Sequence, residues 1–280
     1  MTNRILYISF ILSILLPFVV KSQDSLIYNG ITRDIFIHPA DGYTAYTLPK
    51  GQWIYTQPID LKPGVIQVGL DDKNTLILPA NHWFEKTVSI GYRRKLFSQQ
   101  TWMPSAAIET HYQYLFAPVN QVDFNQNIEV WRLGHNYNLR SNFSWKLEKN
   151  ISVHFSTGFT YTEIFNVNLP DSSYTNDILT GNSLTPDFLL NIEWRAKDWV
   201  AFFVQPSYGS TFFYAENTPR KKQILIASRF APFFKSEKSF FNHLRMEIVY
   251  QGAVFDKNNY FYNIVSGNLY WNFRTNNNNP

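Results

Sequence analysis

The segment from residue 151 to residue 162, ISVHFSTGFTYT, most strongly limits what this chain can fold into, because two different surfaces alternate along it. Its odd positions include Val153, Phe155, Phe159 and Tyr161, whereas its even positions hold only serine, histidine, glycine and threonine. Side chains alternate across a strand with period two, so one face would be apolar and the other polar. About twelve residues is also long compared with the mean soluble strand of about five or six. The pattern favours a transmembrane β-barrel, with the apolar face toward lipid and the polar face toward the lumen.

The amino terminus has the pattern of a secretion signal. Arg4 is the only charged residue before an apolar run from Ile5 to Val20, and Ser22 supplies a small residue for cleavage. The alternative is a membrane-anchoring helix, which Pro17 disfavours, as does a run shorter than the ~20 residues that a spanning helix needs. We therefore expect residues 1–22 to be a signal peptide and the rest of the chain to be exported.

The composition excludes several classes of function. The chain has no cysteine, so disulfides, lipid-modified cysteines, thiol chemistry and cysteine–zinc sites are excluded. The net charge is +4 without a basic stripe, and we expect no nucleic-acid partner. Six histidines are scattered without the spacing of a metal site, and no glycine-rich phosphate loop is present. We therefore expect no metal and no cofactor.

Aromatic residues make up 18% of the chain and charged residues only 16%, compared with about 25% charged in an average soluble domain. Tyrosine and tryptophan favour bilayer interfaces, where an apolar ring lies beside a polar group. The composition thus favours contact with outer-membrane lipid. It is also compatible with a secreted β-sandwich that has an aromatic core or a sugar-stacking surface.

Turn-punctuated β segments follow one another over residues 51–273, and no helical period appears. Bacterial barrels have an even number of strands, so we discount the first of thirteen candidates and predict an all-β, antiparallel transmembrane β-barrel of about twelve strands. Residues 23–50 precede it as a periplasmic lead-in or a segment within the lumen, and residues 274–280 are predicted to be a disordered tail. The candidate strands are 51–57, 64–70, 75–79, 86–95, 104–115, 127–137, 141–148, 151–164, 187–196, 199–214, 222–233, 241–255 and 262–273.

The connections between candidates support the same topology, because bacterial barrels have short periplasmic turns and longer outside loops. Counting back from the last strand places connections 149–150, 197–198 and 234–240 in the periplasm and loops 165–186, 215–221 and 256–261 outside. The same count places connection 116–126 in the periplasm, although its length does not fit the rule.

Two short motifs resemble the opening of a loose group of bacterial outer-membrane β-barrel proteins that are transporter-like. TAYTLPKGQW (residues 44–53) is similar to their "tLpKGqw" strand, and VGLDDKNTLIL (residues 68–78) to their "yGltdnl" hairpin after one inserted residue. The resemblance covers about thirty-five residues, implies an outer-membrane barrel in transport, and supplies no catalytic residues. The matching residues are Leu48, Pro49, Lys50, Gly51, Trp53, Gly69, Leu70, Asp72, Asn74 and Leu76.

A third motif resembles the H-x-S-x-G strand of outer-membrane phospholipases. His154 and Ser156 stand two apart, so the histidine could deprotonate the serine if a third group such as Asn168 orients the ring. The family has asparagine where this chain has Thr157. The alternative is that both residues are ordinary members of a polar lumen face.

Charged residues also recur on the polar faces of several candidate strands. Charge is costly in hydrocarbon, so these side chains should point into the lumen. Because both signs occur, we predict a narrow, cross-linked interior, either a constriction that selects small polar solutes or a salt-bridged plug. The predicted lumen residues are Glu109, His111, Glu193, Arg195, Arg229, Arg245 and Glu247.

The sequence therefore predicts a bacterial outer-membrane barrel that is a channel or transporter for an unidentified small molecule. Three alternatives from other classes stay open. The first is a membrane-embedded lipid hydrolase that uses His154 and Ser156. The second is a structural or assembly barrel that binds a partner through loop 165–186, and the third is a secreted carbohydrate-binding β-sandwich.

Overall fold

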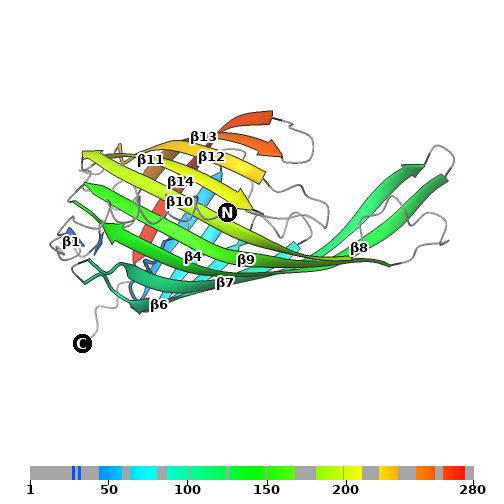
Figure 1. Ribbon diagram of the computed structural model, residues 1–280, viewed down its shortest axis with the longest axis horizontal. Helices are drawn as coiled ribbons and strands as arrows, with labels where there is room; N and C mark the ends of the chain where they lie inside the picture. Colours follow the sequence, from blue (N-terminus) through cyan, green and yellow to red (C-terminus); the bar gives the residue numbers. More distant parts are fainter. Residues whose placement is uncertain are drawn as a thin grey trace, which may run out of the picture.

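Twelve strands, β3 to β14, form one closed antiparallel barrel in which each strand pairs with its neighbours in sequence (Figure 1). Pairing of β14 with β3, between Arg274 and Gln52 at one end, closes the ring. Among the described residues, no helix is long and apolar enough to cross a membrane. The computed structural model describes residues 27–28, 31–32, 44–58, 64–80, 87–100, 102–123, 126–148, 150–167, 181–197, 199–209, 221–232, 244–255 and 261–274.

The strands differ greatly in length around the barrel, and β7 and β8 project beyond the rest of the wall (Figure 1). The strands are β3 (Gln52–Pro58), β4 (Val65–Asp71), β5 (Asn74–Pro79), β6 (Thr87–Phe97), β7 (Ser105–Asp123), β8 (Gln126–Lys146), β9 (Ile151–Val167), β10 (Gly181–Lys197), β11 (Val200–Gly209), β12 (Lys221–Phe230), β13 (Leu244–Phe255) and β14 (Phe261–Arg274). Two short strands, β1 (Ile27–Tyr28) and β2 (Ile31–Thr32), pair only with each other.

The predicted fold class and strand number are confirmed, but two steps of the count were wrong. The discounted first candidate is strand β3, which pairs with β4 and β14. Candidates 127–137 and 141–148 are instead one strand, β8, whose register with β7 is unbroken. Asn138 and Arg140, which lie in the gap between the two candidates, are buried polar residues on the inner face of the strand.

Joining those two candidates also overturns the predicted position of connection 116–126. We call the end of the barrel that carries Gln52 and Arg274 the terminal end, and the opposite end the far end. β7 and β8 pair as far as Asp123 and Gln126, so their hairpin extends from the far end and not from the terminal end. Because the wall is an antiparallel meander, the short joins after β8 and β10 lie at the terminal end, as the count predicts.

The other expected segments lie largely outside the described residues. This applies to residues 1–22 and to residues 275–280, whereas Arg274 ends strand β14. Strands β9 and β10 continue to Val167 and from Gly181, so they take up both ends of the predicted loop 165–186. The sandwich alternative is wrong, because the strands form one closed sheet and not two stacked ones.

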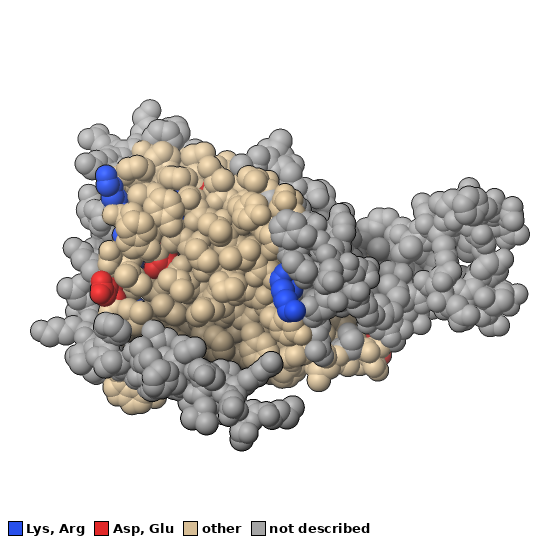
Figure 2. Space-filling model, turned by 45° about the horizontal axis from the view of Figure 1, so that its top comes forward, with Lys and Arg blue, Asp and Glu red and all other residues tan. Residues whose placement is uncertain are grey.

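The wall is apolar outside and polar inside, the reverse of a soluble domain. On β10, Leu190, Ile192 and Trp194 are exposed, while the intervening Asn191 and Glu193 are buried. Period-two alternation produces both faces from one strand, and the closed ladder pairs its backbone groups. Figure 2 shows the result as a broad uncharged face, with lysine, arginine, aspartate and glutamate toward its edges.

The apolar outer face has about the height of a bilayer core. On β10 it runs from Trp194 to Leu184, which are ten residues apart and both exposed. A rise of about 3.4 Å per residue and a tilt of about 40° give a height of about 26 Å, close to the ~25 Å apolar band of membrane barrels. The outer surface therefore has the dimension and chemistry of a lipid-facing wall.

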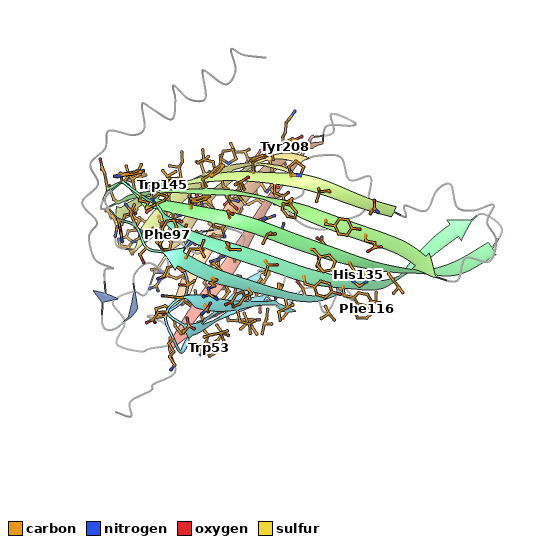
Figure 3. All side chains as sticks on the ribbon, turned by 60° about the horizontal axis from the view of Figure 1, so that its bottom comes forward. Trp53, Phe97, Phe116, His135, Trp145 and Tyr208 are labelled. Atoms are coloured by element: carbon orange, nitrogen blue, oxygen red, sulfur yellow. The ribbon has the colours of Figure 1, made fainter. Side chains whose placement is uncertain are left out.

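Aromatic side chains lie toward both ends of this face (Figure 3). Trp53, Phe97 and Trp145 lie toward the terminal end, and Phe116 and His135 lie on the long strands toward the far end. The far group is linked, because the Tyr112 hydroxyl bonds His135 Nδ1 at 2.9 Å and Tyr114 packs on the same ring. Two aromatic bands of this kind are typical of a barrel at its two membrane interfaces.

Candidate functional site

The first group of inward-facing charges surrounds Glu109 of β7. Arg93 Nε of β6 donates to Glu109 Oε2 at 2.5 Å, and Asn142 Nδ2 of β8 donates to the same oxygen at 3.0 Å. His111 Nε2 lies 2.6 Å from the other oxygen, Oε1. Register brings these side chains together, since Arg93 pairs with Glu109 across the β6–β7 ladder. The buried carboxylate is thus held from three sides.

The second group surrounds Glu247 of β13. Arg229 Nε of β12 donates to Glu247 Oε2 at 2.7 Å, and the Tyr270 hydroxyl of β14 donates to Oε1 at 2.7 Å. Asn268 Nδ2 donates to Oε1 at 3.2 Å. The Arg229 guanidinium also lies over the Phe203 ring, 4.9 Å from its centroid. The ion pair is fully enclosed, because its two side chains are only 2% and 1% exposed.

The third group centres on Glu193 of β10. Arg195 Nε donates to Glu193 Oε1 at 3.2 Å, and His154 Nε2 of β9 lies 3.9 Å from Oε2. The opposite ring nitrogen, His154 Nδ1, forms a hydrogen bond of 2.8 Å with the Ser144 hydroxyl of β8. Each of the three carboxylates lies on the part of its strand nearest the terminal end. Together they form a polar layer of both charge signs within the barrel.

Residues 44–48, from the predicted lead-in, lie against this layer. The Ala45 N–H donates to the Ser144 hydroxyl at 2.9 Å. The Leu48 N–H donates to the Thr75 hydroxyl of β5 at 2.8 Å. Ala45 and Leu48 are both buried. This part of the lead-in therefore occupies the interior, whereas most of residues 23–43 lie outside the described residues.

The side chains around Tyr46 strengthen the same contact. Arg93 Nη1 donates to the Tyr46 carbonyl at 3.1 Å, and the Tyr46 ring packs edge-on against His154 with centroids 5.8 Å apart. Gly69 of β4 gives the segment room, because a Cβ atom there would overlap the carbonyl oxygen of Pro49. The segment thus contacts both the first and the third charged groups.

A further buried carboxylate, Asp187 of β10, lies nearer the middle of the barrel and was missed by the sequence reasoning. Its Oδ2 accepts from Thr160 Oγ1 at 2.6 Å, from Asn138 Nδ2 at 3.2 Å and from Arg140 Nη2 at 3.2 Å. Gly209 has a φ of +117°, and a Cβ atom there would lie 2.6 Å from Asp187 Oδ1. Continuing the period-two parity through residue 140 would have identified Arg140 as an inward-facing partner.

The predicted lumen residues all occupy the inner face of their strands, but they do not form one ring. Six of them fall into the three groups described above. Arg245 is placed differently, since its Nη1 donates to the Leu244 carbonyl at 2.9 Å. Their role in selecting a solute stays a prediction. The buried members are Glu109, Glu193, Arg229 and Glu247, and the partly exposed ones are His111, Arg195 and Arg245.

The hydrolase candidates His154 and Ser156 also face the interior, where both are buried. The Ser156 hydroxyl donates to Asn142 Oδ1 at 2.7 Å, while His154 Nδ1 pairs with Ser144. Asn168 lies outside the described residues. An enclosed serine bonded to an amide does not present a nucleophile to lipid. Within the described part of the chain, no group of three metal-ligating side chains occurs.

Comparisons with known proteins give a likeness at the level of the fold. No protein family model matches the chain, and no curated protein matches it. Among solved structures, the translocator domain of the autotransporter NalP from Neisseria meningitidis is similar, with 9% identity and a TM-score of 0.42. The match covers 80% of this chain and 87% of that one. This similarity concerns the barrel fold and extends no further.

Proposed function

We propose that this chain is an outer-membrane β-barrel that passes small polar solutes, and that residues 44–48 close it at the terminal end. The observation that supports this proposal is that residues 44–48 lie inside the barrel, in contact with the charged layer. Its backbone bonds Ser144 and Thr75, and its Tyr46 carbonyl accepts from Arg93. A passage that can be closed requires a polar interior and a segment that can leave it.

The reversed polarity of the wall supports a membrane location. Soluble monomers rarely expose contiguous apolar patches larger than a few hundred Å². Here exposed apolar side chains follow one another along β10 and continue on β11, as with Phe202 and Val204. The carboxylates and guanidinium groups described above point inward, as expected where the outer face contacts hydrocarbon.

The hydrogen bonds that hold the segment are weak enough to be reversible. They include the two backbone-to-hydroxyl bonds and the Arg93-to-carbonyl bond described above, and a bond of 2.9 Å from Thr47 Oγ1 to the Asp72 carbonyl. A net contribution of about 0.5–1.5 kcal/mol for each of the three neutral bonds and about 1.5–3 kcal/mol for the charged one gives about 3–7.5 kcal/mol. The wall itself is closed by continuous strand ladders. The segment can therefore leave while the barrel stays intact.

The charged layer would then act on whatever enters. Arg93 donates to the segment and is paired with Glu109, which is also bonded by His111. A layer that contains both positive and negative charges has no net field that would favour cations or anions. It therefore favours dipolar or hydroxylated solutes over ions of one sign. Small size follows from the dense cross-linking of this layer.

A disulfide tether tests the proposal, and the chain has no cysteine of its own to interfere. The Ala45 N–H donates to the Ser144 hydroxyl at 2.9 Å, so the two positions are neighbours, and Ala45→Cys with Ser144→Cys would hold the segment in place when oxidised. In planar bilayers we expect opening events in the reduced protein and none in the oxidised protein. The matched control is Ser228→Cys with Ile248→Cys, which are paired within the wall and do not touch the segment.

Conductance of the reduced and oxidised forms of the tethered protein distinguishes the possible outcomes. Equal conductance in both states of the tethered pair would show that residues 44–48 do not close the barrel. Absence of conductance in every protein would reject passage of solutes and favour the structural or assembly alternative. A redox effect in the wall control as large as that in the tethered pair would also count against the proposed segment.

A further inference from the structure

Four polar side chains on the inner wall of β10, β11 and β12 have buried oxygen atoms without a hydrogen-bond partner: Asn191 Oδ1, Gln205 Oε1, Ser207 Oγ and Gln223 Oε1. Asn191 and Gln205 are 1% and 3% exposed. Buried polar groups in native proteins are nearly always paired, so four such atoms in one area offer bonding sites to a ligand. We infer that this amide patch, residues Asn191, Gln205, Ser207 and Gln223, binds a neutral, polyhydroxylated solute.

Register places the four side chains together. Ser207 pairs directly with Gln223 across the β11–β12 ladder. On the antiparallel β10–β11 ladder Ile192 pairs with Val204, so the preceding residue, Asn191, lies opposite Gln205. Adjacent strands are about 4.8 Å apart and two residues span about 6.8 Å, so the patch measures about 10 Å by 7 Å. This is the size of one sugar ring or a short linear polyol.

The chemistry of the patch fits hydroxyl groups better than ions. An amide offers a carbonyl acceptor and two N–H donors, and a serine hydroxyl both donates and accepts. The amide patch itself contains no formal charge. The inward carboxylates that flank it on β10, Asp187 and Glu193, are bonded to Arg140 and Arg195, each at 3.2 Å. A neutral solute with alternating donors and acceptors can satisfy the patch, whereas an ion would lack a countercharge within it.

Apolar side chains lie within the same patch. Leu189 pairs with Ser207, and Leu225 pairs with Gln205, so each of these polar residues has a leucine as its neighbour across the ladder. Both leucines are 5% exposed and face inward. A sugar ring has hydroxyl groups at its edge and C–H groups on its faces. The polar side chains of the amide patch can bond the hydroxyls, and the two leucines can contact the C–H groups.

This inference rests on the proposed function, because the solute reaches the patch through the interior. The test is saturation-transfer NMR on the full chain in detergent, with D-glucose and sorbitol as neutral probes and gluconate as the charged one. We expect saturable signals from the neutral probes and at least tenfold weaker binding of gluconate. Gln205→Leu should weaken glucose binding at least tenfold without destabilising the barrel, since it removes an unpartnered group.

The matched control is Gln67→Leu on β4, because Gln67 is also buried with an unpartnered Oε1 but lies on another part of the wall. It should leave glucose binding unchanged, and Asn191→Leu provides a second variant within the patch. Absence of any neutral-probe signal, equal binding of gluconate, or an equal loss in Gln67→Leu would overturn the inference. Glucose binding without bilayer conductance would support binding at the amide patch and reject passage of solutes through the barrel. Conductance without glucose binding would support passage and reject binding at the amide patch.

Discussion

Neutralising Glu247 should cost the barrel a large part of its stability. Arg229 Nε lies 2.7 Å from Glu247 Oε2, and both side chains are buried. At an effective dielectric constant of about 20, two unit charges at this distance attract by about 6 kcal/mol. In Glu247→Gln the Arg229 charge stays buried without the adjacent Glu247 carboxylate. The new amide N–H₂ must also face a donor, either Arg229 Nε or Asn268 Nδ2.

Breaking a buried pair from one side costs about 3–5 kcal/mol, whereas replacing both partners by apolar residues is often nearly neutral. We therefore expect Glu247→Gln to lower the free energy of unfolding by about 3–5 kcal/mol. Arg229→Leu combined with Glu247→Leu should cost less than Glu247→Gln alone. Reversible urea unfolding in lipid vesicles, followed by tryptophan fluorescence, measures both values.

Two results would refute this reasoning. One is a loss of less than about 1 kcal/mol in Glu247→Gln, since exposed, solvated ion pairs contribute only about that much. The other is a double variant that costs the sum of its single substitutions, which would mean that the two groups do not interact. Either result would imply that water fills the lumen at this level, and the proposed closed layer would have to be abandoned.

The remaining predictions test the membrane wall, the segment and the chemistry. Leu190→Lys should cost about 2–4 kcal/mol in lipid vesicles, and a cost within about 0.5 kcal/mol, as on a soluble surface, would argue against a lipid-facing wall. The refolded chain should run faster unboiled than boiled in gel electrophoresis, and identical mobility would contradict a stable barrel. Gly69→Ala should displace Pro49 and raise the frequency of channel opening in bilayers. An unchanged frequency would show that the close contact between Gly69 and Pro49 does not control opening. Ser156→Ala should leave phospholipid hydrolysis at the background of the parent chain, and a drop in hydrolysis would restore the lipid-hydrolase alternative.

The aromatic and alternating pattern determined the fold class, because the two faces of a strand follow from local backbone geometry alone. The segment around His154 and Ser156 therefore predicted its own inward and outward sides, and the structure agrees. The same locality explains the error at β8. The two candidates were separated at residues 138–140, whereas a barrel with a polar interior accommodates Asn138 and Arg140 within one strand.

The charged groups and the seat of the lead-in could not be read from the sequence, because they depend on which strands become neighbours. Arg93 and Glu109 meet across one ladder, and Ala45 meets Ser144 from 99 residues away. Likewise, the amide patch exists only because the registers of β10, β11 and β12 align its four side chains.

The sequence by itself thus determined strands with one apolar and one polar face, since period-two alternation assigns every side chain to a face. Only the tertiary structure decided which inward side chains pair and which oxygens have no partner. It also decided that residues 44–48 lie inside. The physical reason is that a face is a property of one strand, whereas a contact requires ring closure and a fixed register among many.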